Sequence, residues 1–111
     1  MNFPIDDLAT IVGELFDLSG DSRLSTTDQA MAYQSANLLH NYSEILAQKQ
    51  FDSAKPQYTA AIDKMNQINA DLSVAENEIN QLIQAAKDAA SLVSSVEELL
   101  KTAASFGIAR P

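Results

Sequence analysis

The chain has 111 residues, 46% of them hydrophobic, and it contains no cysteine. This length and composition predict one domain over residues 1–111, and they exclude a disulfide framework, a catalytic thiolate and a thiolate metal site. The net charge of −8 repels phosphate backbones and anionic lipid, so we expect neither nucleic acid nor a membrane as a partner.

The first expected element is a helix over about residues 4–17. Pro4 suits the first helical turn, and Asp6 and Asp7 complement the positive end of the helix dipole. Apolar residues recur on one face with helical spacing: Ile5, Leu8, Val12 and Leu15. The N-terminal residues lack the basic stretch and apolar run of a secretory signal. We therefore expect a cytoplasmic protein, with export by a signal-less route as the alternative.

The next segment, residues 17–28, reads D-L-S-G-D-S-R-L-S-T-T-D and carries an oxygen-bearing group at every second position. Calcium takes about six to eight oxygen ligands, and a twelve-residue loop can supply them with this alternating spacing. The candidate ligands are Asp17, Ser19, Asp21, the backbone carbonyl of Arg23, Ser25 and Asp28. The spacing predicts a Ca²⁺ site, with Mg²⁺ as the alternative ion.

This loop resembles the EF-hand family, with Phe16 just before the first ligand and Leu24 at the apolar eighth position. Gly20 followed by Asp21, and the closing Asp28, are also similar to one half of a dockerin-type repeat. The resemblance covers residues 5–40 and implies a helix-loop-helix that binds one calcium ion. Ser22 stands where the family has Gly, and Asp28 stands where an EF-hand usually has Glu. Both departures predict weaker binding than that of a sensor EF-hand.

A second helix is expected after the loop. Thr26 to Gln29 reads as a capping box, which predicts a helix start there and an end near Gln50. Its expected apolar side consists of Met31, Leu38, Leu39, Tyr42, Ile45 and Leu46. Residues 51–56 then interrupt the helical pattern, because Pro56 disfavours helix in the residue before it and suits a new helix start.

Residues 57–105 contain no Gly and no Pro, and a heptad pattern runs through them without a slip. The a positions are Met65, Leu72, Ile79, Ala86, Val93 and Leu100, and the d positions are Ile68, Ala75, Leu82, Ala89, Val96 and Ala103. This register predicts one long, coiled-coil-type helix over residues 57–106. The alternative is a break at Ser73 or Ser94, since each begins a capping-box pattern that a Glu closes.

The apolar face of the predicted long helix widens after Leu82, through Ile83, Ala90, Leu92, Leu99 and Phe106. A wide face implies more than one neighbour, and a helix of this length would leave much of it uncovered by its own chain. We therefore expect a protein partner or a homo-oligomer to cover the 65–103 heptad face. Ala86 and Ala89, at consecutive a and d positions, predict that a neighbouring helix approaches closely there.

The sequence thus predicts an all-α fold, an EF-hand-like helix-loop-helix followed by a long coiled-coil-type helix in a helical bundle. It contains no nucleophile elbow and no Gly-rich phosphate loop, so we expect no enzyme. The predicted function is a non-enzymatic helical protein-protein interaction module with a calcium-binding loop. The alternative is a metal-free structural or adaptor protein, such as a secretion-associated subunit or an immunity-type protein.

Overall fold

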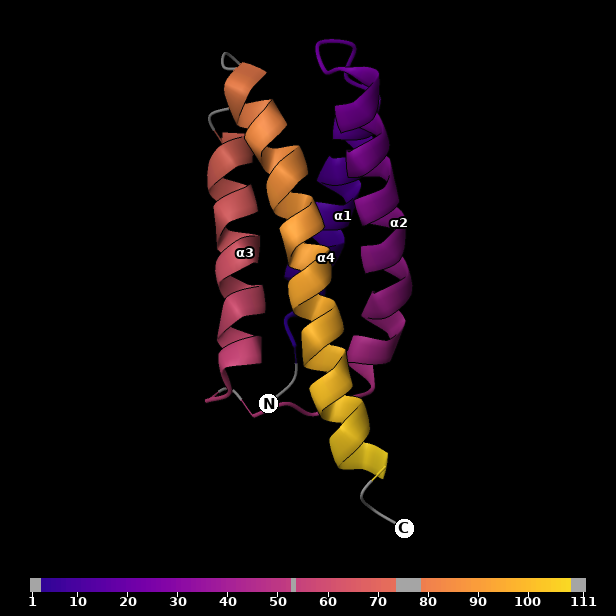
Figure 1. The fold of residues 1–111 in the computed structure, drawn as a ribbon, viewed down its shortest axis with the longest axis vertical. Coiled ribbons are helices and arrows are strands. Elements are labelled where there is room, and N and C mark those ends of the chain that lie inside the picture. Colours follow the sequence, from indigo (N-terminus) through magenta and orange to yellow (C-terminus); the bar gives the residue numbers. More distant parts are fainter. Residues whose placement is uncertain (1–2, 53, 74–78, 109–111) are drawn as a thin grey trace.

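The structure, a computed structural model, describes residues 3–52, 54–73 and 79–108, with side chains as far as Lys101. Over these ranges the chain forms four helices: α1 (Ile5–Ser19), α2 (Thr26–Ala47), α3 (Pro56–Ser73) and α4 (Ile79–Ile108). They run up, down, up and down as an antiparallel bundle (Figure 1). The prediction of an all-α helical bundle is therefore confirmed.

Helix α1 agrees with the helix expected at the N-terminus. Pro4 is the N-cap, and the helix continues two residues beyond the expected end, to Ser19. Its core-facing side chains are Leu8, Ile11, Val12, Leu15 and Leu18. These residues recur at intervals of three and four, which places them on one helical face that the rest of the bundle can cover.

Helix α2 differs from its prediction at the start and on the buried face. The N-cap is Ser25 rather than Thr26, and the Ser25 hydroxyl accepts a hydrogen bond from the Asp28 backbone N–H. The buried residues are Ala32, Ser35, Ala36, Leu39 and Leu46, whereas Ile45 is 45% exposed. Small side chains on this face allow α1 to pack closely against α2, so the buried face follows residue size as well as hydrophobicity.

The prediction of one unbroken helix over residues 57–106 is wrong. Helix α3 ends at Ser73, α4 begins at Ile79, and the two helices pack side by side in opposite directions (Figure 1). The chain thus turns back at the first of the two expected breaks, although Glu76, which would complete that capping box, lies outside the described residues. At the second expected break, Ser94, α4 continues without interruption.

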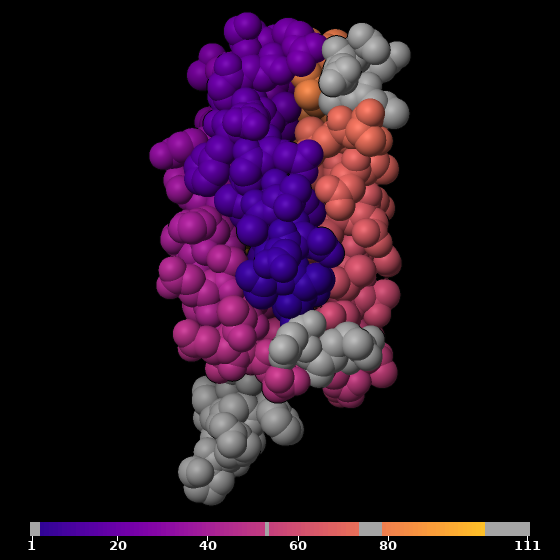
Figure 2. All heavy atoms as spheres, turned by 180° about the vertical axis from the view of Figure 1, so that it is seen from behind, coloured from indigo at the N-terminus to yellow at the C-terminus, as the bar shows by residue number. Residues whose placement is uncertain are grey.

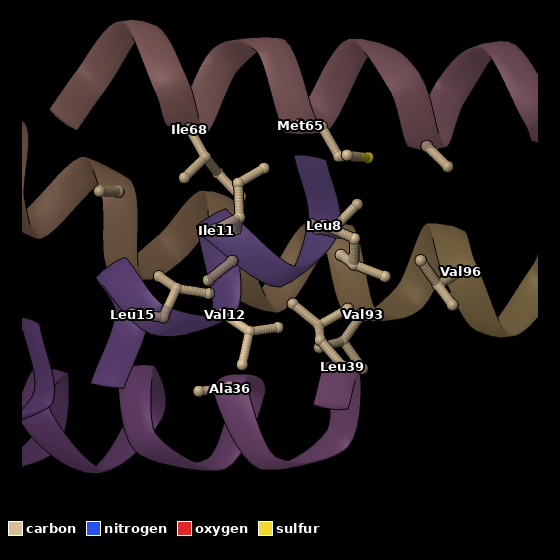
Figure 3. Close-up of a cluster of buried hydrophobic side chains, with 14 of the residues drawn as sticks. Leu8, Ile11, Val12, Leu15, Ala36, Leu39, Met65, Ile68, Val93 and Val96 are labelled. Atoms are coloured by element: carbon tan, nitrogen blue, oxygen red, sulfur yellow. The ribbon is translucent and has the colours of Figure 1, made fainter. Parts of the chain in front are cut away.

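A heptad pattern identifies the apolar face of a helix but does not determine whether the chain continues or folds back. Seven heptad residues are buried inside the bundle: Met65, Ile68, Leu82, Ala86, Ala89, Val93 and Val96. Figure 3 shows several of them facing Leu8, Ile11 and Val12 of α1. Of the remaining positions, Ile79 is 43% exposed. Ala75 and the side chains of Ala103 and Phe106 lie outside the described part of the chain.

The wide apolar face of α4 has more than one neighbour, as its width predicted, because α4 packs mainly against α3 and α2 and also contacts α1. Seen from behind, α1 lies between α2 and α3 (Figure 2). The chain's own helices therefore cover most of the heptad face over 65–101. A partner is not required to bury it, so the argument for an oligomer through this face no longer holds.

The two ends of the bundle are built differently. At one end, Phe3, Phe51 and Tyr58 pack ring against ring, with centroids 5.9–6.3 Å apart. At the opposite end lie the α1–α2 connection, the end of α3 and the start of α4 (Figure 1), and we call this the loop end. The predicted metal ligands lie at the loop end, in the α1–α2 connection and the helix turns that flank it.

Candidate functional site

The α1–α2 connection at the loop end consists of tight turns. The backbone N–H of Gly20 donates to the Asp17 carbonyl (3.1 Å), and that of Asp21 donates to the Leu18 carbonyl (3.0 Å). Leu24 N–H then donates to the Asp21 carbonyl, at 3.1 Å. No residue in the described part of the chain has a positive φ, so Ser22 does not adopt the left-handed turn that an EF-hand requires at this position.

Asp21 is held by Arg23, two residues later. The Arg23 guanidinium donates to both carboxylate oxygens, Nη2 to Oδ2 at 2.7 Å and Nε to Oδ1 at 3.0 Å. The Arg23 backbone N–H also donates to Oδ1, at 2.9 Å. These bonds favour the ionised carboxylate and lower the pKa of Asp21 from 3.8 to about 2. A metal ion at Asp21 would have to replace this internal cation.

The serines and Asp28 take part in helix ends. Ser19 is the last residue of α1, and its hydroxyl donates to the Phe16 carbonyl at 2.6 Å. The Ser25 hydroxyl accepts from the Asp28 N–H at 3.1 Å. Gln29 adds a longer connection, because its side-chain amide donates to the Asp21 carbonyl at 2.8 Å. The oxygens expected to bind calcium are thus largely used to end one helix and begin the next.

An open hollow of about 390 Å³ lies beside these turns. It brings together three of the six predicted ligand residues, Asp17, Asp21 and Arg23, but not Ser19, Ser25 or Asp28. Its other lining residues are Glu14, Leu18, Leu72 and Leu82. In the described ranges, Asp17, Asp21 and Asp28 do not form a three-carboxylate group able to hold a metal ion. Calcium binding by these six residues stays a prediction. In the present conformation of the loop, their oxygens do not converge on one point.

The hollow combines acidic and apolar groups from distant parts of the chain. Leu18 and Leu82, each 4% exposed, belong to the core and provide an apolar base, with Leu72 beside them. Glu14 and Asp17 add two carboxylates from the last turns of α1, whereas the charge of Asp21 is already paired with Arg23. Such a surface suits a side chain with an aliphatic stem and a cationic head.

Two long-range polar contacts were not expected from the sequence. The Tyr42 hydroxyl of α2 donates to Glu97 Oε2 of α4 at 2.7 Å, and this hydrogen bond raises the pKa of Tyr42. Asp71 of α3 contacts Asp88 of α4, which also accepts a hydrogen bond from the Gln84 amide at 3.0 Å. Neither pair has a local sequence signal, because each forms only when the helices fold together.

Comparison of the chain with protein-family models, curated proteins and solved structures finds no match. The resemblance of residues 5–40 to an EF-hand therefore rests on the residues themselves. Among the described helices, none combines the length and apolar character needed to span a membrane.

Proposed function

We propose that this chain is a non-enzymatic helical interaction module that docks a basic segment of another protein in the loop-end hollow. The observation that carries the proposal is the hollow itself. It joins Glu14 and Asp17 to an apolar base formed by Leu18, Leu72 and Leu82. The net charge of −8 favours the approach of a positively charged partner from any direction.

The lining of the hollow suits a lysine or arginine next to a small apolar residue. The aliphatic stem would cover Leu72 and Leu82, while the cationic head would pair with Glu14 and Asp17. The turns beside the hollow are closed by their own hydrogen bonds. This supports the metal-free adaptor interpretation of the loop, because the docking surface needs no bound ion to form.

Nuclear magnetic resonance mapping of the full chain tests this docking surface, with a short peptide of alternating Lys and Leu as the probe. We expect the largest shift changes at the four lining residues Glu14, Asp17, Leu72 and Leu82. The double variant Glu14→Gln/Asp17→Asn should weaken binding at least about tenfold, since two charge pairs are lost. The control Glu44→Gln/Asp63→Asn removes the same charge from exposed positions elsewhere and should bind like the wild type. Equal weakening by both double variants would refute a specific site.

A calcium-binding loop is the second candidate function. It is favoured by the ligand spacing and by Asp17 and Asp28, whose carboxylates make no hydrogen bond to any described residue. Binding would require Asp21 to leave Arg23 and Ser25 to give up its cap, so the calcium form would be a rearranged loop. We expect a dissociation constant of about 10⁻⁵–10⁻³ M for such a site.

Thermal unfolding with increasing Ca²⁺ separates the two candidates. A calcium site raises the melting temperature in proportion to occupancy, and Asp17→Asn/Asp28→Asn should abolish the rise whereas Asp63→Asn should preserve it. No rise at millimolar Ca²⁺ would exclude the calcium function and leave the metal-free adaptor. The peptide experiment is carried out without calcium, so its result does not depend on this one.

A further inference from the structure

Asp71 and Asp88 form a carboxyl pair across the α3–α4 interface, and Asp71 directly precedes Leu72 of the loop-end hollow without lining the hollow itself. Asp88 is only 7% exposed, and its Oδ1 accepts the Gln84 amide at 3.0 Å. The two carboxyl groups are within hydrogen-bonding reach of each other. Asp71 Oδ2 is buried and receives a hydrogen bond from no described donor. A buried acceptor without a donor is costly, so the pair is more stable when one of the two carboxyls carries a proton and can donate.

A proton shared by the two carboxyl groups would supply this donor. Two carboxylates in contact repel each other when both are ionised, whereas one proton between them provides a donor and removes one negative charge. The acidic groups of α1 at this end, Glu14 and Asp17, line the hollow with Leu72, and the Arg23 guanidinium is bonded to Asp21. Lys87, the neighbour of Asp88 on α4, is exposed. Within the described part of the chain, no cation contributes to the pKa of Asp71.

We propose that Asp71 and Asp88 share one proton in the folded protein, and that losing this proton as the pH rises loosens the α3–α4 hairpin. The contact then acts as a pH-responsive element within the bundle. Burial first, and Asp88 second, raise the pKa of Asp71 from 3.8 to about 6. Because the folded state binds the proton more tightly, the stabilising contribution is complete below 3.8 and is lost as the pH rises through 6.

Direct titration of the wild-type chain tests the shared proton without any substitution. The carboxyl carbon resonance of Asp71 should titrate with a midpoint near 6, about two pH units above that of an ordinary aspartate. A midpoint at or below 3.8 for Asp71 would overturn the proposal.

Thermal unfolding of variants tests the effect on the fold. We expect the melting temperature of the wild type to fall by about 5 °C or more between about pH 5 and pH 7.5. Asp71→Asn keeps the shape of the protonated acid and its donor, so its melting temperature should change much less and exceed that of the wild type at the higher pH. Asp63→Asn, an exposed position of the same helix, should retain the wild-type dependence. If the melting temperature of Asp71→Asn depended on pH as that of the wild type does, the Asp71–Asp88 pair would not be the pH-responsive element.

Discussion

Asp21 and Asp71 carry the same side chain, yet the two regions that hold them shift its pKa in opposite directions. In the α1–α2 connection, hydrogen bonds from Arg23 lower the pKa of Asp21 to about 2. At the α3–α4 interface, burial and the carboxyl of Asp88 raise the pKa of Asp71 to about 6. Acidification therefore weakens the first contact and strengthens the second.

The difference between the two regions comes from where the partner lies in the chain. Asp21 bonds to a residue two positions later, in an exposed turn that can form before the bundle does. Asp71 meets Asp88 only after α3 and α4 pack against each other. A local contact of this kind can form without the bundle and contributes little stability, whereas a long-range contact forms only in the assembled fold and leaves no local pattern in the sequence.

The largest effect is expected from breaking the hairpin core. Ile68 is fully buried, so Ile68→Ala should lower the free energy of unfolding by about 2–5 kcal/mol, measured by urea denaturation. Ile79, also a heptad residue, is 43% exposed, and Ile79→Ala should cost less than about 0.5 kcal/mol. Similar losses of unfolding free energy at both positions would contradict the hairpin, in which Ile68 is buried and Ile79 is largely exposed.

Overfilling the same interface should cost less. Ala86 and Ala89 are fully buried on α4, so the double substitution to Leu should destabilise the protein by about 1–3 kcal/mol, because the neighbouring helices have to move apart. The control Ala70→Leu adds the same side chain at an exposed position of α3 and should be nearly neutral. A raised melting temperature in the Ala86/Ala89 variant would show that space remains beside α4.

In the α1–α2 connection, we expect the N-cap of α2 to contribute more stability than any other single contact. Ser25→Ala should lower the free energy of unfolding by about 1 kcal/mol, because the Asp28 N–H loses its acceptor. Thr26, which the sequence pattern suggested as the cap, lies inside α2 and is exposed, so Thr26→Ala should have a smaller effect. If urea denaturation showed a larger loss for Thr26→Ala than for Ser25→Ala, Thr26 would be the N-cap and the predicted capping box would be correct.

Sequence reasoning recovered α1 and the break at Pro56 because helical spacing, Pro and acidic first-turn residues act locally. It favoured a continuous helix and gave the break at Ser73 only as the alternative, since the heptad register of Met65 and Ile68 continues through Leu82 and Val93 as if no turn existed. A heptad pattern shows which side of a helix is apolar. That side can be buried against another helix either in a continuous coiled coil or in a hairpin. The direction of the chain was therefore not predictable from the pattern.

The candidate site was only partly predictable for a related reason. Ser19, Asp21 and Ser25 are spaced as calcium ligands, but the same residue types also end helices, form turns and cap helices. In the structure these local hydrogen bonds are made. The lining of the hollow by Leu72 and Leu82 depends on the hairpin, so no local pattern in residues 5–40 could identify it.

The smallest effect on stability, but the sharpest test of the local region, is Arg23→Gln. Without the guanidinium, the pKa of Asp21 should rise from about 2 toward 3.8, measured by the carboxyl carbon resonance of Asp21. The lowered pKa contributes stability above 3.8 that is lost as the pH falls toward 2, so the variant should differ from the wild type at neutral pH and converge with it in acid. Lys49→Gln removes an equal charge elsewhere and should leave the Asp21 titration unchanged. An Asp21 midpoint that stays near 2 in Arg23→Gln would show that another group holds this carboxylate, and the contrast with Asp71 would then need a cause other than Arg23.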